Sequence, residues 1–327
     1  MQRLDEATSR WDVGALGSVP GGFRPWEDRS LSPEERFTSY KTVVADEVAG
    51  LSIVASKLSD PEFESFSLRP ATLDLLAHAE QLAKMTADEF CWLRDGGLAR
   101  HLMGSNFLGA EEWRAQGIEV GEAPPIPSVI TAGLLNAACP FHPGEKISDT
   151  HLLVLVPKTV NEKPYSPREL HALCATRQGS GEQLIRNVWW KPWKYDAWAM
   201  EQQQESTWVL LPKRDPDPDR CDPDPTKRKG KHFRNKAMDE QQRVLNEHYP
   251  DYRGMSAIEL MTALVLNDLT NKGPRMLDGD HLLRCTNRHL LLYRVAVGKF
   301  GPDGLGVSDC LGIEALSTMG LALARKV

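Results

Sequence analysis

No stretch of this sequence is long and apolar enough to cross a membrane, and its cysteines form no closely spaced pairs. The segment over 290–297 is among the longest apolar runs, and Tyr293 and Arg294 interrupt it, whereas a spanning helix needs about 20 apolar residues. The six cysteines are dispersed without a CxxC pair, which indicates reduced thiols rather than a disulfide framework. The first residues lack the basic start and apolar core of a signal peptide. We therefore expect a cytoplasmic protein that does not associate with membranes.

An overall excess of positive charge is also absent. Lysine and arginine number 39 against 45 aspartates and glutamates, which gives a formal net charge of −6. Nucleic-acid-binding proteins usually carry a basic surface that neutralises phosphates. Any contact of this chain with a polyanion would therefore have to be local.

Motifs of the common enzyme classes are missing as well. The sequence has no Gly-x-Ser-x-Gly elbow, no Gly-x-x-x-x-Gly-Lys-Ser/Thr phosphate loop, no His-Glu-x-x-His motif and no Rossmann glycine fingerprint after a strand. Each of these motifs supplies a backbone geometry or a ligand set that its chemistry requires. Their absence favours a binding module over an enzyme of a familiar class.

The N-terminal third carries helix signals and no alternating strand pattern. Ser32-Pro33-Glu34-Glu35 has the order of a capping box with proline at the first helical position, and it predicts a helix to about residue 58. Further helices are predicted over 70–85 and from Thr86 to about residue 102. A Gly/Pro-rich stretch over 117–127 marks a junction. Because 327 residues are many for a single core, we expect a helical N-terminal domain over 1–118 and a second domain over 119–327.

The second domain mixes strand and helix patterns and ends in strands. Apolar runs over 150–157 and 207–211 have the length of fully buried strands. Capping boxes at Ser166–Glu169 and Ser256–Glu259 predict two helix starts. The C-terminal part predicts strands over 281–286, 290–297 and 320–326, with a hairpin around 301–304. This order is typical of an α+β domain with a mainly antiparallel sheet.

A charged insert occupies residues 213–232. It begins with Lys213 and Arg214, continues as a repeated Asp-Pro ladder and ends in a Lys/Arg-rich block. The basic residues suit a phosphate backbone, but five aspartates in the same segment offset their charge. The Asp ladder lacks the glycine and the distal glutamate of a calcium loop. A solvated surface loop is the preferred interpretation.

Two short motifs together contain the residue types of a zinc site. Cys139 and His142 form a CxxH pair, and His171 and Cys174 form an HxxC pair on a predicted helix. Residues at i and i+3 share one helix face, and two thiolates with two imidazoles satisfy tetrahedral zinc. The alternative is that both cysteines are small buried apolar side chains. Zinc is the only cofactor that the sequence suggests.

The last two thirds of the chain contain a series of distinctive segments. They are Cys139-Pro140-Phe141, the run over 150–157, Trp208-Val209-Leu210-Leu211, Arg234-Asn235-Lys236 with Gln241, Arg284-Cys285, the stretch over 297–305 and the end over 321–326. Together these segments resemble an uncharacterised family of bacterial hypothetical proteins. The resemblance implies no established activity. In that family the segment before the Arg-Asn-Lys motif is short, so the charged insert departs from the pattern.

Three basic residues in or near these segments are candidates for binding an anion or a partner. Arg234, Lys236 and Arg284 are predicted at strand and helix edges. If they converge, the planar fork of arginine and the point charge of lysine suit an anion. Alternatively, they tie structural elements together by binding carbonyls or carboxylates.

The sequence thus leaves two hypotheses about function. The first is a non-catalytic binding protein whose α+β domain recognises a protein or a polyanion. The second is an enzyme with an unfamiliar active site, supported by zinc at Cys139, His142, His171 and Cys174.

Overall fold

The computed structural model describes residues 30–42, 96–127, 129–176, 185–187, 196–214, 233–271, 275–277, 281–289, 291–301 and 304–327. The chain divides into one compact unit over Ala15–Leu98 and another that contains Ala99–Val327. Most of the predicted N-terminal domain lies outside the described residues, including the predicted helix over 70–85. The charged insert beyond Arg214 lies outside them too.

One predicted helix start in the first unit is described, and it is confirmed. The helix covers residues 33–42. The Ser32 amide donates to Glu35 Oε2 at 2.8 Å, and the Glu35 amide donates to Ser32 Oγ at 3.3 Å. These reciprocal bonds satisfy two amides that a helix start leaves unpaired. The hydrogen bonds from Ser32 lower the pKa of Glu35.

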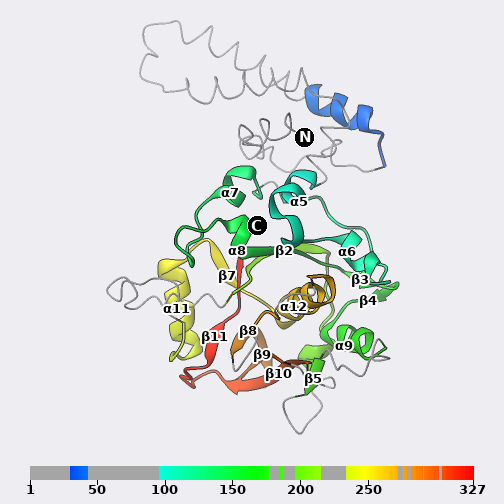
Figure 1. The fold of residues 1–327 in the computed structure, drawn as a ribbon. Helices are drawn as coiled ribbons and strands as arrows, with labels where there is room; N and C mark the ends of the chain where they lie inside the picture. The colour runs from blue at the N-terminus through cyan, green and yellow to red at the C-terminus, as the bar shows by residue number, and fades with distance from the viewer. Residues whose placement is uncertain are drawn as a thin grey trace, which may run out of the picture. The chain divides into compact units, whose positions relative to one another are not determined.

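The second unit is α+β, as predicted, and contains two five-stranded sheets on either side of a central helix, α12 (Figure 1). The first sheet has the order β1 (Phe107–Leu108), β2 (His151–Val156), β6 (Thr207–Pro212), β12 (Leu323–Arg325), β7 (Tyr252–Gly254). The second sheet has the order β11 (Met319–Leu321), β8 (Leu282–His289), β9 (Tyr293–Gly301), β10 (Gly304–Leu311), β5 (Ile185–Asn187).

Both sheets are mixed rather than purely antiparallel. Neighbouring central strands pair antiparallel, and the parallel pairs involve the short edge strands β1, β11 and β5. A separate two-stranded sheet joins β3 (Thr159–Val160) and β4 (Lys163–Pro164). The longer helices are α9 (Pro167–Thr176), α11 (Met238–His248) and α12 (Ala257–Asn271). The shorter ones are α5 (Gly97–Met103), η4 (Gly104–Asn106), α6 (Ala110–Ala115), α7 (Ala132–Asn136), α8 (Ile147–Thr150) and η7 (Ala197–Met200).

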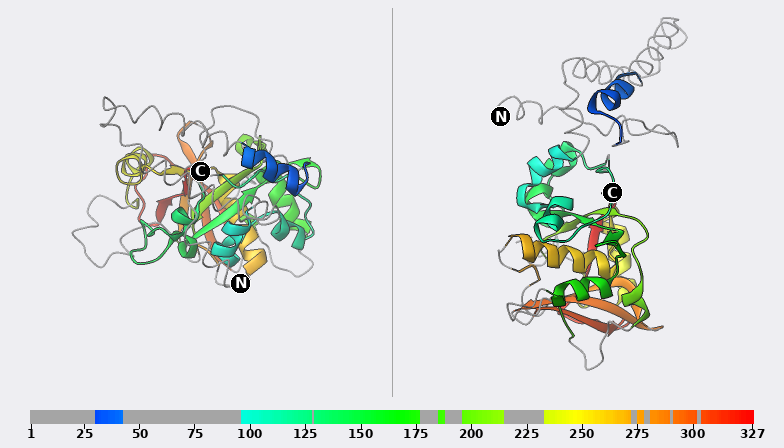
Figure 2. Two further views of the ribbon diagram at one scale, coloured as in Figure 1. Left: turned by 90° about the horizontal axis from the view of Figure 1, so that it is seen from above. Right: turned by 90° about the vertical axis from the view of Figure 1, so that its right-hand side faces the viewer.

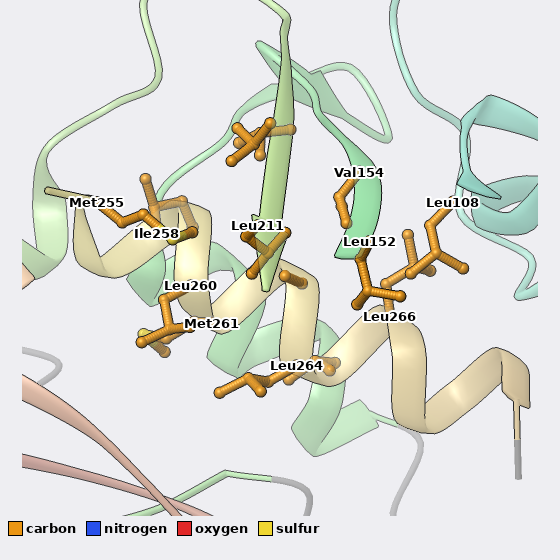
Figure 3. Packing of buried hydrophobic residues seen from close by; sticks show 14 of the residues in the cluster. Leu108, Leu152, Val154, Leu211, Met255, Ile258, Leu260, Met261, Leu264 and Leu266 are labelled. Carbon is orange, nitrogen blue, oxygen red and sulfur yellow. The ribbon is translucent and has the colours of Figure 1, made fainter. Parts of the chain in front are cut away.

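The core of this unit forms around α12, which lies between the two sheets (Figure 2). Eleven consecutive residues from Ala257 to Asn267 are buried, so the helix is covered on every side, as is typical of a central helix. Leu152 and Val154 of β2 and Leu211 of β6 pack with the helix in one apolar cluster (Figure 3). Residues before the predicted junction at 118 also belong to this core, among them Leu108 and Trp113.

The start of α12 is stabilised from three directions. The Ser256 amide donates to Glu259 Oε2 at 2.7 Å, and the Glu259 amide returns to Ser256 Oγ at 3.4 Å. Arg253 donates to both carboxylate oxygens of Glu259, at 3.1 and 2.6 Å. Asn287 of β8 accepts the Ala257 amide at 2.6 Å. The predicted capping box is therefore confirmed, and β8 adds a bond that local sequence does not indicate.

Replacing Ser256 with alanine should destabilise the second unit by about 1 kcal/mol, because an N-cap hydroxyl contributes about that much. Equilibrium unfolding in urea measures the change. The exposed Ser317 is the control: its side chain makes no hydrogen bond to the described residues, and Ser317→Ala should stay within about 0.5 kcal/mol of the wild type. Equal effects of the two substitutions would contradict the capping role of Ser256.

The predicted hairpin around 301–304 joins β9 and β10, with Gly301 opposite Gly304. Gly298 of β9 has a φ of 156°, and a Cβ there would lie 2.2 Å from the carbonyl oxygen of His281. Only glycine permits this approach of two backbones. The strand predicted over 290–297 begins later, at Tyr293, because Leu291 and Leu292 form the turn after β8. Within the described residues, no helix has the length and apolarity of a membrane span.

Candidate interaction surface

Arg284 is the most unusual of the residues singled out from the sequence. Its side chain on β8 is fully buried, and within the described residues it makes no ion pair with a carboxylate. Burying an arginine is costly unless its donors find acceptors. The acceptors are Lys236 O (2.8 Å) and Gln241 Oε1 (3.2 Å) for Nη1, Leu311 O (3.4 Å) and Glu314 O for Nη2, and Cys310 Sγ (3.4 Å) for Nε.

These bonds hold two segments that are far apart in the sequence, residues 233–241 and residues 311–319. Gln241 is buried beside Arg284, and its amide donates to Phe233 O at 2.7 Å and to Met319 O at 3.2 Å. Two backbone bonds complete the junction, from the Met238 amide to Gly312 O at 2.8 Å and from the Asn235 amide to Leu316 O at 3.1 Å. Hydrogen bonds from Arg284 and from the segment over 233–241 therefore fix the loop over 312–316.

The three basic residues predicted to bind an anion lie close to this junction, and each of them already has partners within the protein. Arg234 Nη2 lies 3.0 Å from His281 Nδ1, and Nη1 donates to Ser317 O at 3.5 Å. Lys236 Nζ pairs with Glu240 at 3.2 Å. Arg284 is buried among carbonyls, so it acts as a structural crosslink, in line with the alternative interpretation. An external anion would have to be bound by Arg234 and Lys236 alone.

The four predicted zinc ligands do not assemble. Cys139 packs against Phe141 in an apolar cluster beneath α11, whereas Cys174 on α9 belongs to the core around α12. Both cysteines are buried free thiols, so each fills space as a small apolar side chain. Within the described parts of the chain, no group of three or more His, Cys, Asp or Glu side chains is arranged to hold a metal ion. Of the HxxC pair, Cys174 lies on the buried face of α9, whereas His171 is partly exposed.

Exposed apolar side chains lie on two loops next to the Arg284 junction. Among the described large apolar residues, the three most exposed are Leu291 (91%), Ile313 (72%) and Leu292 (61%). Leu291 and Leu292 form the turn between β8 and β9, and Ile313 follows β10. The Gly312 amide donates to Leu292 O at 2.8 Å, which places the two loops side by side. We call Leu291, Leu292, Ile313 and the half-exposed Leu316 the apolar surface.

Two arginines stand opposite each other next to the apolar surface. Arg288 of β8 pairs in register with Arg294 of β9, and like charges in this position repel. Arg294 donates to Thr286 O at 3.1 Å. Burial and the nearby Arg288 lower the pKa of Arg294, whereas Asp239 raises it. Arg288 is exposed and makes no hydrogen bond or ion pair to the described residues.

A buried polar network at the start of β2 is the first of two places where residue types used in catalysis converge. The Thr150 hydroxyl donates to Lys146 O at 2.8 Å, so its oxygen accepts from His151 Nδ1 at 2.9 Å. His151 Nε2 is then the acceptor for the Tyr252 hydroxyl at 2.9 Å. Burial lowers the pKa of His151 to about 3 and raises that of Tyr252. The imidazole is therefore neutral and internally bonded at neutral pH, which suits a structural tie rather than a base.

His142 stands close to this network and differs from His151. It is buried, and its Nε2 atom has no hydrogen-bond partner among the described residues. Burial and then the charge of Arg214 lower its pKa, while Glu145 raises it. A neutral imidazole is therefore the stable form in the fold. Lys213 and Arg214 lie nearby. Lys213 donates to Asn106 Oδ1 at 3.0 Å and Arg214 pairs with Glu145 at 3.1 Å, so both cations have partners within the protein.

The second convergence joins η7 to the second sheet. His289 Nδ1 lies 2.8 Å from Asp309 Oδ2, and Nε2 lies 3.4 Å from Asp196 Oδ2. One imidazole is thus held between two carboxylates. Because carboxylates engage both ring nitrogens, this histidine is oriented as a bridge between Asp196 and Asp309.

Sequence reasoning singled out Arg284 as a candidate but predicted neither its burial nor the apolar surface. Leu291 and Leu292 were assigned to a strand, because consecutive leucines are typical of buried segments. A usable signal was their position between two strand patterns, where a turn must fall. No protein-family model, curated protein or solved structure was found to match the chain.

Proposed function

We propose that the α+β unit is a protein-binding module that recognises its partner through the apolar surface together with Arg288. One observation carries the proposal: the three most exposed large apolar side chains of the described residues lie on two hydrogen-bonded loops beside the exposed Arg288. Contiguous exposed apolar residues mark interaction sites. Arginine flanking apolar anchors is typical of the residues that dominate binding energy.

The rigidity of the loop over 312–316 supports the same function. The Arg284 guanidinium donates to the carbonyls of Leu311 and Glu314. The backbone amides of Met238 and Asn235 donate to the carbonyls of Gly312 and Leu316, respectively. A loop that is already ordered loses little conformational freedom on binding. The buried arginine, which the sequence suggested as a binding residue, would then serve binding indirectly by positioning Ile313.

The charge of Arg288 indicates the chemistry of the partner. Arg288 faces Arg294 across the strand pair, and Asp239 is the acidic neighbour that acts on Arg294. A carboxylate of a partner would relieve the repulsion between the two arginines. The expected partner therefore presents an acidic side chain next to apolar ones.

An enzymatic function is supported less well. The imidazoles of His151 and His289 are engaged on both nitrogens by groups of the protein. The zinc quartet is not assembled within the described residues. The family resemblance and the cytoplasmic location stay predictions, and the resemblance brings no activity that would favour an enzyme.

A paired capture experiment tests the proposal. The full chain, the double variant Leu291→Asp/Ile313→Asp and the control Val129→Asp/Met200→Asp would be immobilised and exposed to extract of the source cells. Quantitative mass spectrometry should show a protein that the wild type and the control retain and the first variant loses by about tenfold or more, which corresponds to about 1.4 kcal/mol. The control places the same charges on exposed apolar residues elsewhere. Identical profiles for all three proteins would overturn the proposal.

A further inference from the structure

The surroundings of the apolar surface carry charges of both signs. Arg288 and Arg294 lie on the strands that its turn connects, and Asp239 lies on the first turn of α11. Asp239 is exposed, and its charge acts on Arg294. Gly312, which precedes Ile313, lies close to Arg294 and to Met238 of α11: a Cβ at Gly312 would be 3.9 Å from Arg294 Cγ and 4.0 Å from Met238 Cβ. Charged side chains of both signs therefore lie close to the apolar residues.

From this arrangement we propose that the occupant of the apolar surface is a second copy of the chain, related to the first by a two-fold axis. This inference rests on the proposed protein-binding function and names its partner. Around a two-fold axis, a residue that contacts a second residue across the interface is contacted by it in return. Arg288 of each copy then meets Asp239 of the other, while Leu291, Leu292 and Ile313 of both copies pack together.

Charge complementarity favours this occupant. Within the described residues of a single copy, Arg288 has no carboxylate partner and lies opposite another arginine. Across the axis, Asp239 supplies the acidic group that the proposed function requires, and it lies beside apolar residues of the same kind.

The association state of the full chain tests the inference. Sedimentation velocity over a hundredfold range of concentration around about 10 µM should show a reversible shift from monomer to dimer. Leu291→Asp/Ile313→Asp should remain monomeric over the same range, whereas Val129→Asp/Met200→Asp should follow the wild type. A wild type that is monomeric throughout would overturn the inference, and so would a dimer that survives the first double variant.

A charge-exchange experiment tests the orientation of the two copies. Arg288→Glu and Asp239→Arg should each weaken self-association about tenfold or more, since each places like charges across both symmetric contacts. An equimolar mixture of the two variants should form a heterodimer. In that heterodimer the glutamate introduced by Arg288→Glu faces the arginine introduced by Asp239→Arg, and the native Asp239 and Arg288 face each other at the second contact. Circular dichroism confirms that both variants are folded. A mixture no stronger than the separate variants would overturn the proposed pairing.

The two proposals fail in different ways. If the wild type is monomeric but the capture experiment finds a protein that only the apolar-surface variant loses, the inference is wrong and the binding function holds. If neither experiment responds to Leu291→Asp/Ile313→Asp, the binding function itself is wrong.

Discussion

Replacing Arg284 with methionine should lower the free energy of unfolding of the second unit by about 3 kcal/mol or more. Methionine fills the same apolar space but donates no hydrogen bond. The carbonyls of Lys236, Leu311 and Glu314 and the amide oxygen of Gln241 would then lose a donor at once. Each buried polar group left without a partner costs about 1–3 kcal/mol, and the three chain segments that meet there would separate more easily.

Urea unfolding followed by tryptophan fluorescence measures this loss, since Trp113, Trp198 and Trp208 are buried in the same unit. Arg284→Lys should recover only part of the stability, because one ammonium group cannot reach acceptors on both sides of a planar guanidinium. Arg243→Met is the matched control, as Arg243 is exposed on α11 and its ion pairs with Glu240 and Glu247 lie at the surface, where such pairs contribute about 0–1 kcal/mol. A loss for Arg284→Met no larger than that of the control would contradict the crosslinking role.

Arg284→Met should also weaken binding under conditions where the protein is still folded. The loop that carries Ile313 is attached to the sheet through this guanidinium, so its loss increases the freedom that binding must remove. Association should fall without any change in the exposed side chains. An Arg284→Met protein that is folded and associates like the wild type would show that the loop is fixed by its backbone bonds alone.

Acidification should destabilise the second unit through His151, by a total on the order of 4 kcal/mol between pH 6.5 and pH 3. Its pKa is about 3 in the folded protein and about 6.5 in the unfolded chain. Well above pH 6.5 neither state binds the proton, and the stability is complete. Below pH 6.5 the unfolded chain takes up a proton that the folded protein refuses, so stability falls by up to about 1.4 kcal/mol per pH unit until the pH nears 3.

Unfolding free energies of the wild type and His151→Gln, measured from pH 8 to pH 4, isolate this contribution. Glutamine can both accept and donate but does not titrate, so the variant should lose stability more slowly as the pH falls. His248→Gln, which makes the same substitution at an exposed histidine, is the matched control. Parallel curves for the wild type and His151→Gln would show that the buried imidazole takes up its proton without unfolding.

Elements with local signals were predicted well. The helix starts at Ser32 and Ser256 require only a hydroxyl and a glutamate three residues apart, and both are confirmed. The run over 150–157 was correctly assigned to a buried strand, now β2, because continuous apolar residues of that length are covered on both faces. The hairpin at 301–304 followed from its glycines.

Features that depend on distant contacts were predicted less well. Cys139 and Cys174 have ligand chemistry, but the fold places them in different apolar clusters. Leu291 and Leu292 look like core residues until the register of β8 and β9 assigns them to a turn. Arg284 was a candidate binding residue from the sequence, and its fully buried state could not be foreseen from neighbouring residues.

The sequence by itself determined the α+β class of the second unit, the starts of α9 and α12 and the longer strands. Those features depend on hydrogen bonds and apolar periodicity within a few residues. Only the tertiary structure decided that Arg284 is a buried crosslink and that Leu291, Leu292 and Ile313 are exposed together. The acceptors of Arg284 come from two segments 26 to 48 residues away in the chain, and no short-range pattern encodes which segments meet. Whether a charged side chain can be buried depends on where its hydrogen-bond acceptors lie. The acceptors of Arg284 are brought together only by the whole fold.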